Sequence, residues 1–168
     1  LAASAGLSIV TFVEPVFYDP ATYLKDPTLK AAAAMLAPLD RAALAERLSG
    51  GLTKHVAYLA PAARAATATA TLDDGALRPV LRDGNGPAIA EAARRGPLKL
   101  RHLGADIARP LPRLAPAILR RIDGRARIDD IYRDISAADP GLDRRRFDAA
   151  FGEVCAALGG LNLLWLAR

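Results

Sequence analysis

The stretch AGLSIVTFVEPVFYDPATYLKDP, from Ala5 to Pro27, decides the first part of the fold. Its apolar run, Ile9 to Val13, follows a Gly-Leu turn and ends at Glu14-Pro15, a pattern that predicts a buried strand preceded by the end of a helix. Leu1 to Ala5 would form the last turn of that helix. The chain begins with leucine rather than methionine, and we expect it to be a fragment of a longer protein.

A helical insertion is predicted between this strand and a second one. Apolar residues recur at helical spacing from Tyr18 to Ser49, with Asp26-Pro27 at the start of one helix and Asp40 as the cap of another. Gly50-Gly51 would end the second helix. The run from His55 to Leu59 then predicts the second strand.

The chain is predicted to have two parts joined by a linker. The segment ARAATATAT lacks large apolar side chains and is typical of an exposed linker or an edge strand. We therefore assign residues 1–61 to the first part, 62–75 to the linker and 76–168 to the second part. The second part would begin with a strand, a turn at Asp83–Gly86, a helix and another strand.

The C-terminal region is predicted to contain three helices and a strand. The helices would cover about 114–122, a segment from about Asp129, and a segment that Asp143 caps and Gly159-Gly160 ends. LNLLWLAR would be the final strand, with Trp165 as a core anchor. Helix, short extended piece, helix, helix and strand is the order of a winged-helix domain.

Composition and charge limit the setting of the protein. The chain has 52% apolar residues, enough to bury a core, and its single cysteine, Cys155, favours a reducing cytoplasm and a small buried side chain. No apolar run reaches the roughly 18 residues of a membrane helix. The formal net charge is −1 over residues 1–77 and +6 over residues 78–168. We expect a cytoplasmic protein without a membrane partner.

Three segments resemble the end of the catalytic domain in a group of bacterial class I S-adenosylmethionine-dependent methyltransferases. They are AGLSIVTFVEP, YDPATYLKDP and LTKHVAYLAP, within Leu1 to about Pro61. In that Rossmann-like α/β fold the sheet ends with a parallel strand and a final antiparallel strand, which would be Ser8–Val13 and His55–Leu59. Further on, ILRRIDGRARIDDIY resembles the helical or winged-helix tail of some such enzymes, which implies an α+β accessory domain, regulatory or docking in role.

The resemblance implies an enzyme that transfers a methyl group from S-adenosylmethionine to an acceptor by in-line displacement. The acidic residue and spaced glycines that bind this cofactor are absent from the sequence, so the missing N-terminal part would hold the cofactor and this chain alone would be inactive. The Asp83–Gly86 cluster is typical of a tight turn instead. His55 and His102 lack the spacing and partners of a metal site, and no metal is expected. The acceptor stays open between a small molecule and a protein, and a homodimer is one expected assembly.

Candidate substrate-binding residues follow the first strand. Ligands of open α/β sheets bind outside the carboxyl ends of parallel strands, so the loop after Val13 would supply a substrate wall. Its members would be Glu14, Tyr18, Asp19 and Tyr23. A carboxylate there can orient or deprotonate an amine or hydroxyl, and a tyrosine ring can stack beside the methyl-accepting group. The alternative is that the acidic residues set turns before prolines and the rings pack the insertion.

A second hypothesis is a non-enzymatic winged-helix module that binds nucleic acid or a partner protein. Arg144, Arg145 and Arg146 begin the predicted third helix, the element that enters the major groove in DNA readers. Aspartates interleaved with the arginines equally fit a solvated, salt-bridged face. A third hypothesis makes the C-terminal region a dimerisation or docking module and the insertion from Tyr23 to Ser49 a lid.

Overall fold

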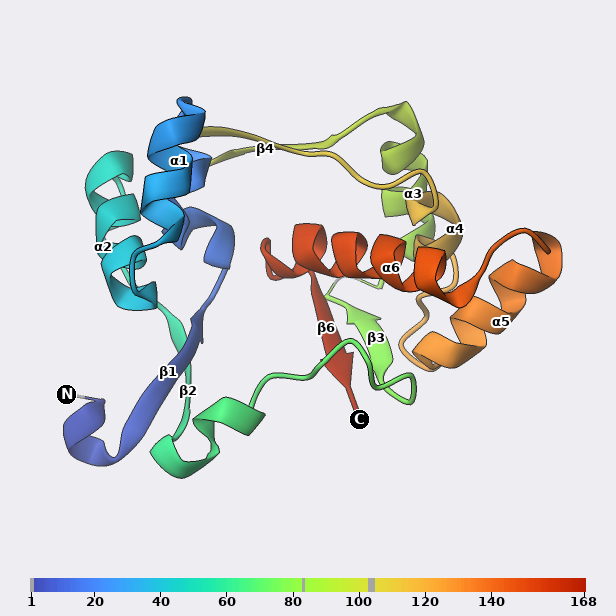
Figure 1. The fold of residues 1–168 in the computed structure, drawn as a ribbon, viewed down its shortest axis with the longest axis horizontal. Helices are drawn as coiled ribbons and strands as arrows, with labels where there is room; N and C mark the ends of the chain where they lie inside the picture. The colour runs from blue at the N-terminus through green and yellow to red at the C-terminus, as the bar shows by residue number, and fades with distance from the viewer. Residues whose placement is uncertain (1, 83, 103–104) are drawn as a thin grey trace. The chain divides into compact units, whose positions relative to one another are not determined.

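The computed structural model describes residues 2–82, 84–102 and 105–168, with the side chains of 100–102 and 105 left out (Figure 1). It is a mixed α/β chain with small antiparallel sheets, compatible with an α+β fold. Two compact units share the chain: unit 1 is Leu1–Thr69 with Lys99–Ile107, and unit 2 is Ala70–Leu98 with Ala108–Arg168. Each unit is described by itself below.

A two-stranded antiparallel ribbon is the centre of unit 1. It consists of β1 (Leu7–Phe12) and β2 (Ala57–Pro61), which Figure 1 shows in blue and blue-green. The register shifts between Ile9 and Thr11, which is a β-bulge that bends the strand and strengthens its twist. The first strand is close to its predicted range. The second begins two residues later than predicted, because pairing with β1 rather than composition decides where it starts.

Short 3₁₀ helices flank the ribbon. The helix η1 (Ala3–Ala5) ends at Gly6, whose φ of +69° closes the turn before β1. Residues 62–75, the predicted linker, begin with η4 (Ala62–Thr67), an exposed 3₁₀ helix rather than an edge strand. It is tied to the ribbon because the Ala62 N–H donates to the Gly6 carbonyl over 2.9 Å.

The predicted helical insertion is present between β1 and β2. It comprises η2 (Pro15–Tyr18), η3 (Pro20–Thr22), α1 (Pro27–Ala34) and α2 (Pro38–Ser49). Asp26 caps α1 as predicted, since its Oδ1 accepts from the Thr28 N–H at 2.7 Å. The predicted Asp40 cap is wrong. The N-cap is Ala37, because Pro38 has the φ of a first helical residue and α2 starts three residues earlier than an Asp40 cap would place it.

Unit 2 contains a second antiparallel pair and most of the longer helices. The pair is β3 (Arg78–Leu81) with β6 (Leu164–Ala167), and the helices are α3 (Gly86–Arg95), α4 (Ala115–Leu119), α5 (Ile128–Ala138) and α6 (Arg144–Gly159). As predicted, Asp143 caps α6 by accepting from the Arg146 N–H at 2.7 Å. β4 (Leu98–His102) and β5 (Ala105–Arg109) form a further pair, most of whose residues belong to unit 1, and β5 was not predicted.

The core of unit 2 is formed by large apolar side chains of α4, α5 and α6. Phe147 and Phe151 stack at 5.7 Å between ring centroids. The fully buried side chains around them are Ile118, Leu119, Ile128, Ile131, Val154 and Leu158. Cys155 lies at the edge of this core, as a small apolar residue would, and burial raises the pKa of its thiol to about 12. That thiol is therefore an inert packing group at neutral pH.

Two expectations for the C-terminal region need correction. Trp165 is not a core anchor: it is 37% exposed, and its indole Nε1–H donates to Asn162 Oδ1 at 3.0 Å. Residues alternate across a strand, and here Leu164 takes the inward position of β6. The piece between α4 and α5, predicted to be short and extended, is a loop of turns and bends. The order α4, α5, α6, β6 matches the rest of the prediction, and the winged-helix assignment stays a prediction.

None of the helices in the described ranges combines the length and the apolar character that crossing a membrane requires.

Candidate functional site

A hollow of about 200 Å³ lies at the carboxyl end of β1. One of its sides comes from the segment that leaves β1 and the other from the segment that enters β2. Because these strands are antiparallel, the end of one and the start of the other meet at the same end of the ribbon. The lining residues are Val13, Glu14, Phe17, Tyr18, Gly51, Leu52, Thr53, Lys54 and Val56.

The backbone at Glu14 has an unusual conformation. Its φ of +56° and ψ of +63° are in the left-handed region, although the residue is not glycine. Such a conformation costs on the order of 1–3 kcal/mol and is found most often at binding sites and active sites. Here it turns the chain sharply between the ribbon and η2, so that both Glu14 and Tyr18 line the hollow.

The Tyr18 side chain contacts Phe12 through its ring and His55 through its hydroxyl. Its ring stacks on Phe12 with 4.0 Å between centroids, and its hydroxyl lies 3.3 Å from His55 Nδ1. Burial raises the pKa of Tyr18 above its ordinary value, and the nearby carboxylates of Glu46 and Glu14 raise it as well. A hydrogen bond with the backbone of Val56 acts in the opposite direction and lowers this pKa. The phenol therefore keeps its proton at neutral pH.

The other two predicted site residues stabilise the insertion. Asp19 Oδ1 accepts from the Ala21 N–H at 3.1 Å and pairs with Arg41 at 3.2 Å. Tyr23 donates its hydroxyl hydrogen to the Phe17 carbonyl at 3.1 Å, and burial raises its pKa. Neither belongs to the described residues that line the hollow. The structure thus brings Glu14 and Tyr18 together and directs Asp19 and Tyr23 into contacts within unit 1.

Three polar residues near the hollow were not among the predicted site residues. Lys54 lines it, and His55 lies between Tyr18 and Glu46, with 3.8 Å from His55 Nε2 to Glu46 Oε1. Lys54 and His55 directly precede the second strand. In an antiparallel pair the start of one strand lies beside the end of the other. The final antiparallel strand that the resemblance implies could therefore have placed Lys54 and His55 near Glu14.

The glycine-rich loop does not fit a cofactor cradle. Asp83 lies outside the described residues. The Asn85 side chain caps α3 by accepting from the Ala88 N–H at 3.1 Å. A Cβ on Gly86 would collide with the backbone oxygen of Leu119, so glycine serves the close packing of α3 against α4. The described part of this loop therefore caps α3 and lets it pack closely against α4.

The side chains that could bind a metal ion are scattered over the described residues. Over the described ranges, no group of three or more His, Cys, Asp or Glu side chains is arranged to hold a metal ion. The side chain of His102 lies outside the described residues.

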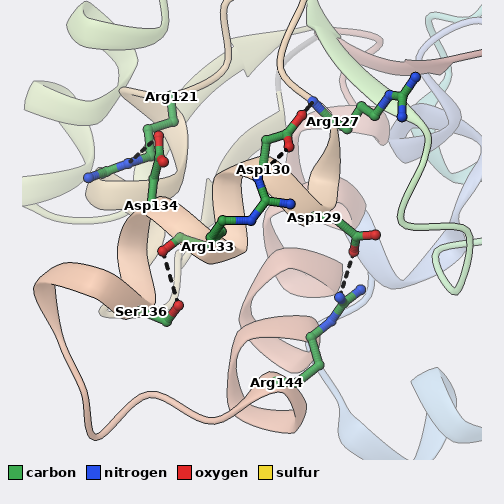
Figure 2. A network of polar contacts seen from close by, with 8 residues as sticks. All are labelled: Arg121, Arg127, Asp129, Asp130, Arg133, Asp134, Ser136 and Arg144. Carbon is green, nitrogen blue, oxygen red and sulfur yellow. Dashed lines mark hydrogen bonds and ion pairs between the residues drawn. The ribbon is translucent and has the colours of Figure 1, made fainter.

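The arginine cluster at the start of α6 is partly neutralised (Figure 2). Arg144 bonds Asp129 at 2.6 Å and Asp148 at 2.7 Å, and its guanidinium lies 5.3 Å from the centre of the Tyr132 ring. These carboxylates, Asp148 foremost, raise the pKa of Arg144. Arg145 and Arg146 are exposed, and Arg146 donates to the Gly141 carbonyl at 3.2 Å.

The neighbouring charges on α5 form similar pairs. Figure 2 shows Asp130 accepting from Arg133 at 3.0 Å and from the backbone N–H of Arg127, and Arg121 facing Asp134 at 3.9 Å. Exposed pairs of this kind contribute roughly 0–1 kcal/mol each. This part of unit 2 is a salt-bridged face, and the free positive charge at α6 is smaller than the sequence count suggests.

Comparison of the chain with protein-family models and with curated proteins found no match. The function is therefore argued from the hollow in unit 1 and from the surfaces around it.

Proposed function

We propose that this chain is the C-terminal portion of an S-adenosylmethionine-dependent methyltransferase. Unit 1 would supply part of the wall of the acceptor site, and unit 2 would be an accessory domain that regulates or docks. The observation that carries the proposal is the hollow at the carboxyl end of β1, where Glu14 and Tyr18 face Lys54. In the proposed enzyme β1 would join a mostly parallel sheet, and ligands of such sheets bind outside the carboxyl ends of the parallel strands.

The strand arrangement supports the same proposal. The resemblance to class I methyltransferases implies two closing strands, the last of them antiparallel to its neighbours, and β1 and β2 are an antiparallel pair separated by a helical insertion. An isolated two-stranded ribbon is marginally stable in water. A ribbon of this kind gains stability when it is the edge of a larger sheet.

The exposed apolar surface of the ribbon also favours a larger sheet. Val56, Tyr58 and Leu59 are between 44% and 49% exposed. A groove of about 640 Å³ follows β1 and is lined by all six of its residues together with the start of α2. Exposed apolar side chains on both strands of a ribbon are what an edge that pairs with further strands would present. In the proposed enzyme, strands and helices of the catalytic domain would cover it.

The residues of the hollow suit the orientation of an acceptor. Methyl transfer needs positioning of the acceptor more than a dedicated base. Glu14 and Tyr18 offer oxygen atoms to an amine or hydroxyl of the acceptor, while Val13, Phe17 and Val56 provide an apolar surround. In this proposal S-adenosylmethionine would be bound by the N-terminal part of the enzyme, because the sequence lacks the acidic residue and spaced glycines of the family's cofactor motif.

The reading frame upstream of Leu1 provides the first test. A strand followed by an acidic residue and spaced glycines is expected there. The protein extended by that segment should transfer labelled methyl groups from S-adenosylmethionine to an acceptor. A start codon directly before Leu1, without such a segment, would overturn the proposal.

Substitutions in the extended enzyme test the site itself. Glu14→Gln or Tyr18→Phe should lower turnover about tenfold, the effect of losing one hydrogen bond of about 1.4 kcal/mol. The affinity for S-adenosylmethionine, measured by calorimetry, should change little. Matched controls in unit 2 are Glu153→Gln and Tyr132→Phe, which should leave turnover unchanged. Unchanged turnover in both site variants would remove the assignment of the hollow.

The alternative function, nucleic-acid binding through α6, has its own test. Arg145 and Arg146 are the exposed cations at that helix start. If the chain binds duplex DNA, its affinity should fall steeply as the salt concentration rises, by a slope of about 0.9 per phosphate contacted. The methyltransferase proposal expects no binding at about 50 mM salt, where such contacts are strong.

A further inference from the structure

Three side chains form a continuous line of contacts from α2 to the hollow. Glu46 on α2 lies 3.8 Å from His55 Nε2, and His55 Nδ1 lies 3.3 Å from the Tyr18 hydroxyl. The three come from α2, the segment before β2, and η2. Tyr18 is the member of this line that reaches the hollow.

The line of contacts favours one arrangement of the protons on His55 and Tyr18. Glu46 accepts and does not donate when ionised, so its position near Nε2 favours the histidine tautomer that carries its proton there. Nδ1 is then an acceptor, and the Tyr18 hydroxyl donates to it. Glu14 and Glu46 are the carboxylates that act on Tyr18, and Lys54 is the cation at the hollow.

The direction of the Tyr18 hydroxyl decides which hydrogen-bonding group it presents to a molecule bound in the hollow. A phenol has one hydrogen to donate and lone pairs to accept with. With the hydrogen directed to His55 and the ring held by Phe12, the oxygen offers a lone pair rather than a hydrogen to the hollow. Glu14 lines the same hollow and is a second acceptor.

We propose that His55 is a positioning residue that orients the Tyr18 hydroxyl, so that the hollow selects a methyl acceptor with an N–H or O–H donor. This inference rests on the proposed function. It adds the chemical class of the acceptor group and a residue that acts through Tyr18 rather than on the acceptor.

Nitrogen NMR of this chain tests the proton arrangement without any activity. The chain has two histidines, so a His102→Gln background leaves the ring of His55 alone in the spectrum. The Nε2–H tautomer is expected, and Tyr18→Phe and Glu46→Gln should each shift the Nδ1 resonance. Tyr132→Phe, a tyrosine change in α5, is the matched control and should leave it unchanged. An Nδ1 resonance that Tyr18→Phe does not move would overturn the inference.

Kinetics of the extended enzyme test the consequence. His55→Phe should raise the KM for the acceptor about tenfold, the effect of a misdirected hydrogen bond of about 1.4 kcal/mol, with unchanged affinity for S-adenosylmethionine. His55→Gln should restore much of the loss, because an amide oxygen can accept from Tyr18. Equal effects of both variants would contradict the positioning role.

The two proposals fail in different ways. A wild-type extended enzyme without methyl transfer would overturn the proposed function, whatever the NMR result. An active enzyme whose His55 ring does not respond to Tyr18→Phe would overturn only the inference about His55.

Discussion

Unit 1 and unit 2 differ in how well they bury their own apolar residues. In unit 2 the largest fully buried side chains, such as Phe147, Phe151 and Ile118, pack around one another. In unit 1 the buried apolar set is small and rich in alanine, with Val16, Phe17 and Ile107 as its larger members.

The exposed side chains show the same contrast. Most of the large hydrophobic residues on the described surface belong to unit 1, and Met35 on α1 is 87% exposed. The members in unit 1 are Ile9, Leu29, Met35, Leu36, Leu39, Leu48, Val56, Tyr58 and Leu59. Unit 1 thus has a small core and a large apolar surface, whereas unit 2 has a core of the kind found in independent domains.

Separating the two parts of the chain should give the largest effect. Residues 70–168, which contain all of unit 2, should unfold cooperatively in urea, because that unit contains its own core. Residues 2–69 should unfold in a broad transition at lower urea and bind an apolar dye. Circular dichroism and dye fluorescence provide the measurement. A cooperative, dye-free fragment 2–69 would remove the contrast between the units.

Aromatic truncations in the two cores should give the next largest effect. Phe147→Ala should lower the free energy of unfolding by about 3–5 kcal/mol. The truncation leaves a cavity in a tightly packed core whose side chains cannot move in to fill it. Phe17→Ala in unit 1 should lower the free energy of unfolding by less, since the smaller core around Phe17 can move in to fill the space. The exposed Met35→Ala is the control, expected within about 0.5 kcal/mol. Urea titration of the whole chain measures all three, and equal costs for the two phenylalanines would make the cores equivalent.

A charge on the ribbon should give the smallest effect in this chain. Leu59 is 49% exposed, so Leu59→Lys should change stability by within about 0.5 kcal/mol. In the extended enzyme the same change should be strongly destabilising, because a covered lysine loses its hydration. Leu29→Lys, on the exposed side of α1, is the matched control. If the extended enzyme tolerates Leu59→Lys as well as this chain does, nothing covers the ribbon.

Local patterns predicted most of the helices and strands. Asp26 and Asp143 cap their helices because a carboxylate satisfies the first free N–H groups, an interaction within a few residues. Gly50 ends α2 with a φ of +60° for a similarly local reason. The predictions that rest on distant contacts were less accurate. The exposure of Trp165 and the start of β2 depend on which strand pairs with which.

For the candidate site as well, local sequence suggested the residues, and distant contacts decided how they are arranged. Sequence position alone suggested Glu14 and Tyr18, because both follow a strand that ends in an open loop. Sequence position suggested Asp19 and Tyr23 on the same ground, but their hydrogen bonds to Arg41 and to the Phe17 carbonyl depend on how the insertion folds back.

The sequence by itself determined most of the helices and strands, the caps at Asp26 and Asp143 and the mixed α/β class, because these follow from periodicity and from hydrogen bonds within one turn. Only the tertiary structure decided that β1 pairs with β2 and that Glu46, His55 and Tyr18 form one line. Contacts between residues far apart in the chain depend on the whole set of packing choices, and no short window of sequence contains that information.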